Sequence, residues 1–416
     1  MIKPNILTVI CAPDWGGLQV VVQRTTPFLR RSGFERIVAM PVLRLSMQHD
    51  LEAAGCRVVA HDFVRPRKAI DPRLLWRYLS GFSTDVRAIE CLAREHQVSL
   101  IEASGLHHLQ AVLAAKRLGL PLVWQLHGTS APRWLRIAIG SLASRWADVV
   151  MTSGRGMIER HGGLERIAGR IIPFCAPLDP ARFRPDPALR RQVRSLWGYS
   201  DEQIVVGTLG NHGPVKNQGM IVQVARRLQR ENLPFRFAIC GNALHANSTY
   251  FESQVLRPIE QRGLSGYVRV FAPAVPAEAV MNAFDIFILT SRGEGASLVT
   301  AEAMATGLPV IATDVGSLRD LVREGENGIL VDPDDVESAA AALRLLADPE
   351  LRAQMGQRSL KMAVASVSSE RCAMAHLEAY RRALKITREK VSNLGEMFTQ
   401  QPLAQGDGEM EEVGRC

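Results

Sequence analysis

The chain has 416 residues, of which 47% are apolar and 22% are charged, so it exceeds what one hydrophobic core usually organises and is too apolar to be disordered or fibrous. Its charge is uneven, because residues 1–200 carry 28 basic against 15 acidic side chains, whereas the remainder carries 22 against 27. The basic half favours an anionic partner such as phospholipid or a lipid diphosphate, with a merely solvated surface as the alternative, and without a recognisable nucleic-acid motif we expect no nucleic-acid partner.

The chain carries no sign of export or of a membrane span. The apolar run within Met1 to Ile10 is too short for a secretory signal peptide, and no stretch approaches about 20 uninterrupted apolar residues. The seven cysteines show neither a C-x-x-C pair nor zinc-ligand spacing, which is typical of reduced thiols in the cytosol. We therefore expect a cytoplasmic protein.

Short β-rich runs alternate with helical patterns along most of the chain, as in parallel sheets built from strand–helix–strand units. The strands expected in the first half are residues 6–10, 36–42, 98–103, 121–127, 148–153 and 170–174. A proline-rich stretch from Pro173 to Pro187 interrupts the alternation and is typical of an interdomain linker. The strands expected in the second half are residues 204–210, 235–241, 267–273, 285–291, 309–315 and 328–333.

This alternation predicts two doubly wound α/β domains in tandem. We expect one domain over residues 1–180 and a second over 181–368, followed by a helix over 369–390 and a disordered tail over 391–416. Ligands of such sheets bind outside the carboxyl ends of the strands. Two sheets that face each other therefore predict a binding cleft between the domains.

The strongest local pattern is the segment SRGEGASLVTAEAM, residues 291–304, which follows a predicted buried strand and opens a helix. Its small residues leave the backbone N–H groups of Ser297, Leu298 and Val299 free to bind an anion such as a diphosphate, and the helix dipole strengthens that attraction. Glu302 is placed to accept hydrogen bonds from ribose hydroxyls, and Glu294 to reach a sugar beyond the phosphates. The alternative is two solvated glutamates around an ordinary helix start.

The same segment resembles the signature of glycosyltransferase family 4. The matching residues are Ser291, Glu294, Gly295, Leu298, Glu302, Ala303, Met304, Ala305, Gly307, Pro309 and Val310. Residues 178–185, 207–218 and 314–335 resemble further motifs of the family. The resemblance implies the GT-B fold, in which two Rossmann-like domains face a cleft and the C-terminal helix returns to the first domain. It also implies retaining transfer of a sugar from a nucleoside-diphosphate-sugar, with no cofactor.

The resemblance assigns roles to four further residues. Lys216 stands where the family has the lysine that neutralises the donor diphosphate, and His127 where it has a histidine that meets the donor sugar and the acceptor. Gly16 and Gly17 follow the first strand, as the family's glycine-rich loop does, and glycine lets backbone approach a ligand closely. A structural histidine and an ordinary strand–helix turn are the alternatives. The expected catalytic residues are Lys216, His127 and Glu294.

The sequence also predicts catalysis without a metal ion. No Asp-x-Asp pair lies where metal-dependent transferases carry theirs, and Asp332-Pro333-Asp334 falls in a late loop, where we expect Asp334 to cap a helix. A fixed positive charge can stabilise leaving-group charge as a metal ion does. We therefore expect Lys216 and the helix start to replace Mg²⁺ or Mn²⁺.

Asn211 is the point at which the sequence departs from the family, because it stands five residues before Lys216 where an arginine is usual. Asparagine donates only neutral hydrogen bonds, which are about half as strong as charge-assisted ones. We expect Asn211 to contact the diphosphate and Arg292 or Arg319 to supply the missing charge. A slow enzyme and a protein that binds donor without turnover are the alternatives.

The acceptor is indicated only by two segments, 63–82 and 133–146, which mix arginines with tryptophans and aliphatic residues. Such a mixture suits helices at an anionic membrane surface, and packed helices with solvated arginines are the alternative. We expect a saccharide or lipid-linked saccharide acceptor, as in surface polysaccharide or glycolipid biosynthesis. Two other classes stay open, a catalytically impaired binding protein of the same fold and another nucleotide-sugar enzyme such as an epimerase.

Overall fold

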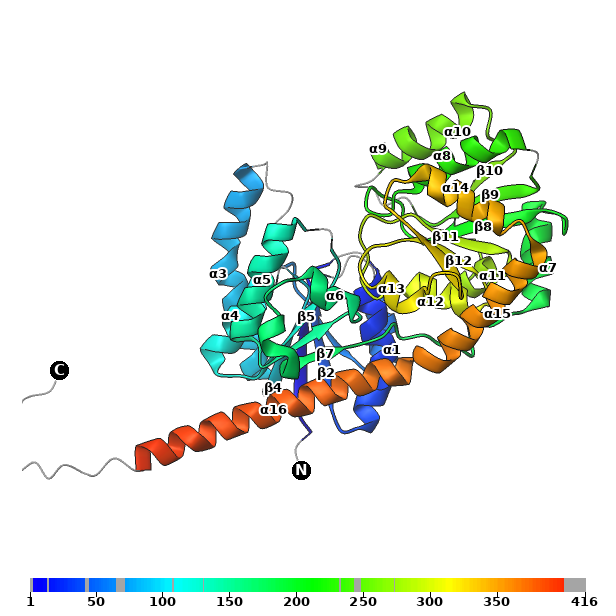
Figure 1. Cartoon of the computed structure of the whole chain (residues 1–416). Helices are drawn as coiled ribbons and strands as arrows, with labels where there is room; N and C mark the ends of the chain where they lie inside the picture. The colour runs from blue at the N-terminus through cyan, green and yellow to red at the C-terminus, as the bar shows by residue number, and fades with distance from the viewer. Residues whose placement is uncertain are drawn as a thin grey trace, which may run out of the picture.

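The computed structural model of the chain describes residues 3–12, 15–41, 45–64, 72–106, 108–129, 131–231, 233–242, 248–272 and 274–399. Two α/β domains lie side by side, and two consecutive long helices, α15 (Pro349–Ser366) and α16 (Ser369–Thr399), run along one side of both (Figure 1). The two doubly wound domains expected from the sequence are confirmed.

The first domain is built on a parallel sheet with the strand order β3-β2-β1-β4-β5-β6-β7. Its strands are β1 (Asn5–Val9), β2 (Glu35–Met40), β3 (Arg57–Ala60), β4 (Val98–Ser104), β5 (Leu122–Leu126), β6 (Val149–Thr152) and β7 (Ile171–Pro173). Its helices are α1 (Gly17–Arg31), α2 (Leu45–Ala53), α3 (Pro72–Glu95), α4 (Leu109–Leu118), α5 (Arg133–Trp146) and α6 (Gly156–Arg160), with a 3₁₀ turn at Glu165–Arg170. The central strands are almost wholly buried runs, as expected of a parallel sheet covered on both faces.

The second domain repeats the plan with the order β10-β9-β8-β11-β12-β13. Its strands are β8 (Ile204–Leu209), β9 (Phe235–Cys240), β10 (Val268–Phe271), β11 (Ile286–Leu289), β12 (Val310–Thr313) and β13 (Gly328–Val331). Its helices are α7 (Pro187–Trp197), α8 (Gln218–Leu228), α9 (Ser248–Phe251), α10 (Arg257–Gln261), α11 (Ala277–Asn282), α12 (Leu298–Ala305), α13 (Leu318–Leu321) and α14 (Val336–Leu345). A 3₁₀ turn follows α8 at Gln229–Glu231, and a π-helical segment, Glu252–Leu256, joins α9 to α10.

Three features differ in detail from the sequence prediction. Strand β3 was not among the expected strands, because it has only four residues, at the edge of the sheet, and its apolar run is too short to stand out. The linker between β7 and α7 is not loose, since Phe174, Leu178 and Phe183 are buried in the cores it connects. Helix α16 extends to Thr399, so the first part of the expected tail is helical, and residues 400–416 lie outside the described residues.

Helix α16 completes the core of the first domain. It begins beside the second domain and packs against α1 and against strands β4 to β7 (Figure 1). Tyr380 and Leu377 on this helix are buried with Ile6, Leu29 and Val123 in one apolar cluster. Helix α16 therefore belongs structurally to the first domain.

The two domains also touch where α6 meets α13. Gly154 has a φ of 100°, and a Cβ atom there would lie 2.4 Å from Cβ of Ser317, so only glycine allows this approach. The backbone N–H of Gly156 donates to Oδ2 of Asp320 at 3.1 Å. These contacts hold the loops of the two sheets close together.

Candidate functional site

A cavity of about 510 Å³ lies between the domains, at the carboxyl ends of their strands. The loops after β1, β5, β8 and β11 form most of its wall. Strands β1 and β4, and likewise β8 and β11, are neighbours at which the strand order reverses, and doubly wound sheets bind ligands at such points. All ten residues nominated from the sequence line this cavity: Gly16, Gly17, His127, Asn211, Lys216, Glu294, Ser297, Leu298, Val299 and Glu302.

Lys216 and Glu294 form an ion pair in the wall of the cavity. Lys216 follows β8 and Glu294 follows β11, so the pairing of these strands brings the two loops together. Nζ of Lys216 lies 2.6 Å from Oε1 of Glu294, and the hydroxyl of Ser291 donates to the same oxygen at 2.5 Å. The Glu294 side chain is 6% exposed and that of Lys216 is 32% exposed, so the ammonium group is the more accessible partner.

The start of α12 presents backbone donors to the cavity. Ser297 precedes the helix with a φ of 24°, an uncommon conformation for a residue other than glycine. The N–H groups of Ser297, Leu298 and Val299 donate no hydrogen bond to any described residue. Helix α1 begins at Gly17 on the wall formed by the first domain. Two positive helix ends and Lys216 therefore favour an anion here.

Glu302 is held by Arg24, a residue of α1 that sequence reasoning missed. Nη2 of Arg24 lies 3.0 Å from Oε1 of Glu302, and its Nη1 donates to the carbonyl oxygen of Pro177 at 2.9 Å. Glu302 lines the cavity as a largely buried residue, because it is only 9% exposed. Burial raises the pKa of its carboxyl group, while Arg24 opposes that rise. No local pattern distinguishes Arg24 from other helical arginines.

His127 directly follows strand β5, and its ring packs on residues of the first domain. Its Nε2 lies 2.9 Å from Oε1 of Gln125, and its ring contacts that of Phe174 with 5.5 Å between the centroids. Burial lowers the pKa of His127 to about 3. The imidazole is therefore neutral near pH 7, so it can offer or accept a hydrogen bond but carries no charge to a ligand.

Asn211 spans the two domains, because its Nδ2 donates to the carbonyl oxygen of Trp15 at 3.4 Å. Arg292 and Arg319 were expected to replace the arginine that the family has at the position of Asn211. Both are engaged by aspartates outside the cavity: Arg292 is paired with Asp334 at 2.7 Å, and Arg319 with Asp314. Neither lines the cavity, so that expectation is wrong. Lys216 is the single Lys or Arg among the described residues of the cavity wall.

The acidic residues of the site are committed to cations of the protein. Glu294 pairs with Lys216 and Glu302 with Arg24. Within the described ranges, no three His, Cys, Asp or Glu side chains are grouped as metal ligands would be. Asp334 does not cap a helix as expected, because Asp335 caps α14 by accepting from the N–H of Ser338 at 2.9 Å.

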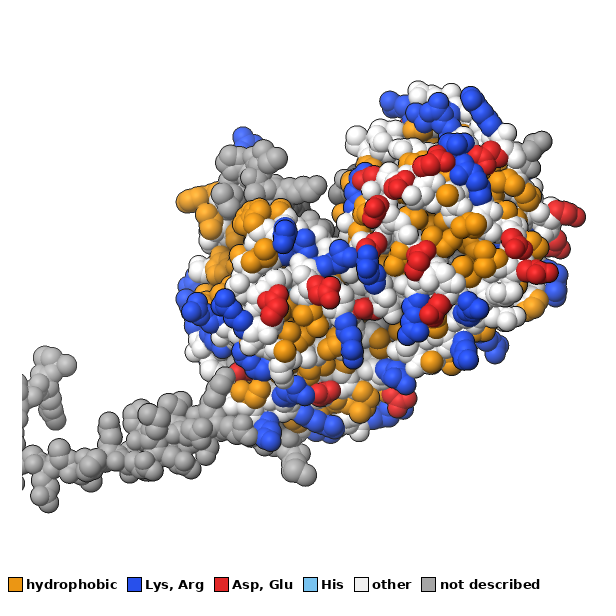
Figure 2. Space-filling view, viewed as in Figure 1, with side chains coloured by type: hydrophobic (Ala, Val, Ile, Leu, Met, Phe, Trp, Pro, Cys, Tyr) orange, Lys and Arg blue, Asp and Glu red, His pale blue; other side chains and the backbone are white. Residues whose placement is uncertain are grey.

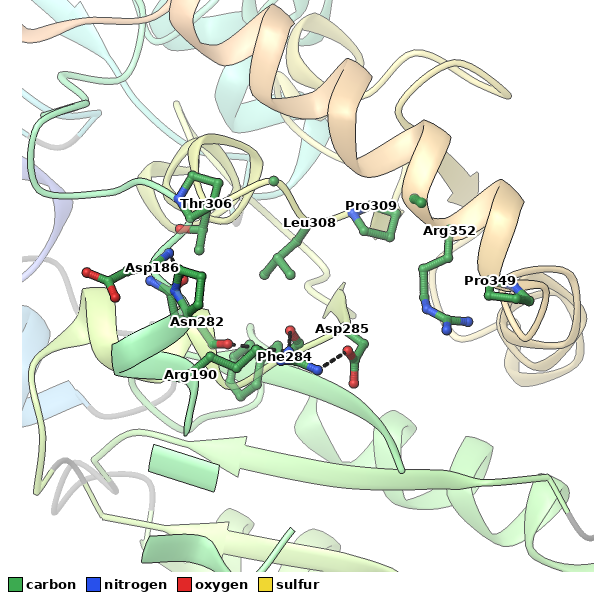
Figure 3. A pocket seen from close by; sticks show the side chains of 14 residues that line it. Asp186, Arg190, Asn282, Phe284, Asp285, Thr306, Leu308, Pro309, Pro349 and Arg352 are labelled. Atoms are coloured by element: carbon green, nitrogen blue, oxygen red, sulfur yellow. Dashed lines mark hydrogen bonds and ion pairs between the residues drawn. The ribbon is translucent and has the colours of Figure 1, made fainter. Parts of the chain in front are cut away.

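A second cavity, of about 370 Å³, lies at the amino ends of the strands of the second sheet, where Asp285 precedes β11 and Pro309 precedes β12 (Figure 3). The interdomain cavity lies at the other ends of these strands. Its charged groups are satisfied within the protein. Arg190 is paired with Asp285 at 2.7 Å, and Arg352 donates to the carbonyl oxygens of Leu346 and Ala347. This pocket offers a ligand none of the unpaired donors found in the interdomain cavity.

Two family profiles match the chain. Residues 191–362 match the family described as Glycosyl transferases group 1. Residues 16–175 match the Glycosyl transferase 4-like domain. Since the two matches cover both domains, the chain belongs to the group 1 glycosyltransferases, and the resemblance to glycosyltransferase family 4 is confirmed.

Relatives align over most of the chain. A D-inositol 3-phosphate glycosyltransferase of Gordonia bronchialis is 26% identical over 396 residues, which cover 89% of this chain and 85% of that protein. A GDP-mannose-dependent alpha-(1-6)-phosphatidylinositol monomannoside mannosyltransferase of Mycolicibacterium smegmatis is 28% identical over 363 residues, 83% of this chain and 89% of that protein.

Solved structures share the fold. Anabaena HepE in complex with UDP and glucose superposes with a TM-score of 0.72 at 19% identity, over 91% of this chain and 99% of that one. Sucrose-phosphate synthase of Thermosynechococcus elongatus has a TM-score of 0.73 at 18% identity, over 92% and 100% of the two chains. The architecture is therefore GT-B, and the chain is a glycosyltransferase of GT-B type.

Replacing Lys216 or Glu302 by alanine is expected to lower sugar transfer by about 10²–10³-fold, the usual cost of removing one preorganised charge contact. Steady-state kinetics would measure the loss, and thermal unfolding would show that the fold persists. Arg227→Ala is the matched control, because Arg227 pairs with Glu231 and Glu337 outside the cavity. Turnover of Lys216→Ala or Glu302→Ala at the level of this control would contradict the site assignment.

Proposed function

We propose that the chain is a retaining, metal-independent hexosyltransferase that takes its sugar from a nucleoside-diphosphate-sugar in the interdomain cavity. The supporting observation is the convergence of Lys216, the free N–H groups at the start of α12 and the carboxylate of Glu294 on one cavity. The first two match a diphosphate and the third matches sugar hydroxyls. Glu302 would then accept from the ribose, with Arg24 holding its carboxylate.

The reaction we propose needs no nucleophile from the protein. Glu294 is already committed to Lys216 and Ser291, and His127 is neutral and bonded to Gln125. Neither is therefore set up as a nucleophile. An oxygen of the leaving diphosphate would receive the acceptor proton while the acceptor attacks from the same face, which gives retention. Lys216 and the α12 start would stabilise the charge that develops on that diphosphate.

Metal independence predicts that transfer survives excess EDTA. Lys216 and the backbone donors supply the positive potential, and both carboxylates of the wall are neutralised by protein cations. Product formation would be followed after the chelator has been added and again after Mg²⁺ or Mn²⁺ has been returned. Loss of transfer that one of these ions specifically restores would show that a metal supplies the charge.

A donor-binding protein without turnover is the second candidate. Asn211 favours it, because Lys216 is left as the one cation among the described residues of the wall. A nucleotide-sugar that raises the unfolding temperature without hydrolysis or transfer to any acceptor would select this candidate. A panel of donors in the same assay would also identify the base and the sugar.

The acceptor we propose is a saccharide or lipid-linked saccharide reached from an anionic membrane, in the assembly of a glycolipid or surface polysaccharide. Apolar side chains gather over α3 and α5 in Figure 2. Trp76 and Leu79 on α3 are 71% and 60% exposed, and Trp134 and Ile137 on α5 are 70% and 40% exposed. The named relatives act on a phosphorylated inositol and on a phosphatidylinositol mannoside, which also favours an anionic acceptor.

Only part of each nominated segment supports this surface. In segment 133–146, Ile139 is buried and Leu135 and Trp146 pack on the core of the first domain. Arg136 donates to the carbonyl oxygens of Ala131 and Arg160, whereas Arg133 and Arg145 are exposed. In segment 63–82, residues 65–71 lie outside the described residues. None of the described helices has the length and apolar character needed to cross a membrane.

The surface predicts salt-sensitive binding to vesicles that contain anionic lipid, because arginines add electrostatic attraction to the insertion of tryptophans. In a flotation assay, the double variant Trp76→Ser/Trp134→Ser should stay with the soluble fraction. Leu345→Ser is the control, since Leu345 is 59% exposed but lies on the second domain. Equal flotation of both variants, or no flotation of the unaltered protein at any salt concentration, would favour a soluble acceptor.

A further inference from the structure

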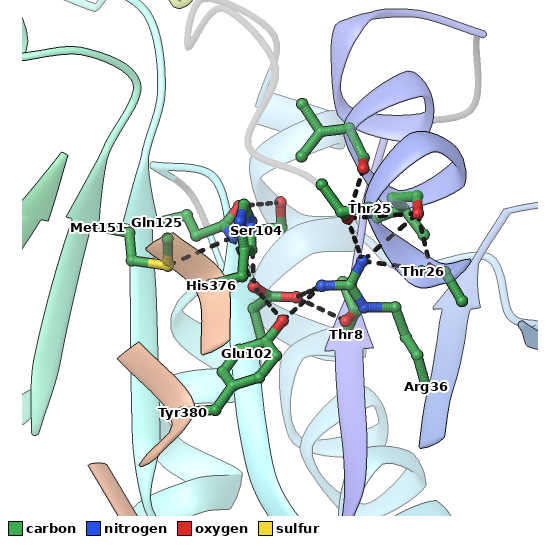
Figure 4. A network of polar contacts seen from close by, with 12 residues as sticks. Thr8, Thr25, Thr26, Arg36, Glu102, Ser104, Gln125, Met151, His376 and Tyr380 are labelled. Atoms are coloured by element: carbon green, nitrogen blue, oxygen red, sulfur yellow. Dashed lines mark hydrogen bonds and ion pairs between the residues drawn. The ribbon is translucent and has the colours of Figure 1, made fainter. Parts of the chain in front are cut away.

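A buried polar network joins His127 in the cavity to helix α16. It contains Glu102 and Gln125 on neighbouring strands and His376 and Tyr380 on the helix (Figure 4). Glu102 and Gln125 are 1% and 2% exposed, and the two helical residues are fully buried. Buried polar groups of this kind are costly unless every hydrogen bond has a definite donor and acceptor.

The hydrogen bond from His376 to its own helix determines which of its ring nitrogens carries the proton. Its Nδ1 lies 2.8 Å from the carbonyl oxygen of Cys372, which can only accept, so Nδ1 carries the proton. Burial lowers the pKa of His376 to about 4, so the ring is neutral and its Nε2 holds a lone pair. That Nε2 lies 3.0 Å from Nε2 of Gln125 and accepts from it.

Glu102 also requires the nitrogen of the Gln125 amide, and not its oxygen, to face the side of Glu102 and His376. Its Oε1 lies 2.5 Å from Nε2 of Gln125 and can only accept while the carboxyl group is ionised. Burial alone would raise the pKa of Glu102, but Arg36 and its hydrogen-bond donors lower it below its ordinary value. Thr8 and Tyr380 donate to its two oxygens at 2.6 Å and 2.9 Å.

The oxygen of the Gln125 amide must then face His127. Since this oxygen only accepts, Nε2 of His127 at 2.9 Å carries the ring proton. Ser104 donates to the same amide oxygen at 3.0 Å. The other ring nitrogen of His127, Nδ1, makes no hydrogen bond to any described residue and holds the lone pair of a residue that lines the cavity.

We propose that Gln125, oriented by Glu102 and by His376 of α16, is a positioning residue that fixes the tautomer of His127, so that Nδ1 accepts a hydrogen bond from a sugar hydroxyl. The ring of Phe174 holds the same geometry, because it lies 5.5 Å from the ring of His127 and 5.1 Å from that of His376. The sugar as ligand rests on the proposed function, whereas the tautomer does not. The C-terminal helix thereby contributes to the cavity without lining it.

Nitrogen NMR of the intact protein with ¹⁵N-labelled histidine tests the tautomer without activity. The His127 signals, assigned by their loss in His127→Gln, should show a protonated Nε2 and an unprotonated Nδ1. In Gln125→Leu this preference should be lost, and kcat should fall about 10- to 100-fold, as for other supporting hydrogen bonds behind a site. The affinity for UDP or GDP should stay within about twofold, because Nδ1 meets the sugar and not the diphosphate.

Gln110→Leu is the matched control. It removes an equally buried amide from the same domain, where Gln110 donates only to the carbonyl oxygen of Val64. Protonation of Nδ1 in the unaltered protein, or the same kcat and tautomer in Gln125→Leu and Gln110→Leu, would overturn the proposal even if Gln125→Leu folds poorly. If the expected tautomer is present and is lost in Gln125→Leu while the unaltered protein transfers no sugar, the positioning stands and the proposed function fails.

Discussion

The ion pair between Lys216 and Glu294 is the interaction on which the site depends. Its two members come from the loops after β8 and β11, which the strand order makes neighbours although Lys216 and Glu294 are 78 positions apart in the chain. Glu294 is nearly buried, so its charge needs a close cation, and Lys216 supplies it at 2.6 Å. A nucleoside-diphosphate-sugar would offer phosphate oxygens to the ammonium group and hydroxyls to the carboxylate, so both charges stay compensated when the ligand binds.

The rest of the architecture joins the two domains around this pair. Arg24 reaches from the first domain to Glu302 and to the linker carbonyl of Pro177, and Gly154 lets the loop after β6 approach Ser317. The two domains are thus joined by two sets of contacts. One set needs the Arg24 side chain, and the other needs a residue without a side chain at position 154.

The sequence was informative wherever a feature is local or repeats with a fixed period. Buried strands such as β8 and β11 appear as apolar runs, and the glycine-rich and small-residue loops that follow them mark the cavity wall. Individual ion pairs leave no such pattern. Arg24, which pairs with Glu302 across the domains, is one arginine among many on amphipathic helices. The sequence likewise does not show that Arg292 pairs with Asp334 and Arg319 with Asp314 within the second domain. Gln125 is likewise an isolated polar residue within a strand, and its partner on α16 is 251 residues away. The edge strand β3 was not predicted because its apolar run, Val58 to Ala60, is only three residues long.

We propose that the diphosphate of the donor binds to Lys216, to the backbone donors at the start of α12 and to Asn211. Titration calorimetry of UDP and GDP measures this directly on the unaltered protein, Lys216→Met and Asn211→Arg. A hydrogen bond to a charged group contributes about 1.5–3 kcal/mol, so Lys216→Met should bind about 10- to 100-fold more weakly. Asn211→Arg should bind more tightly, because it adds a second positive charge beside Lys216. Equal affinity of all three proteins for both nucleotides, or no binding of either by the unaltered protein, would contradict the account.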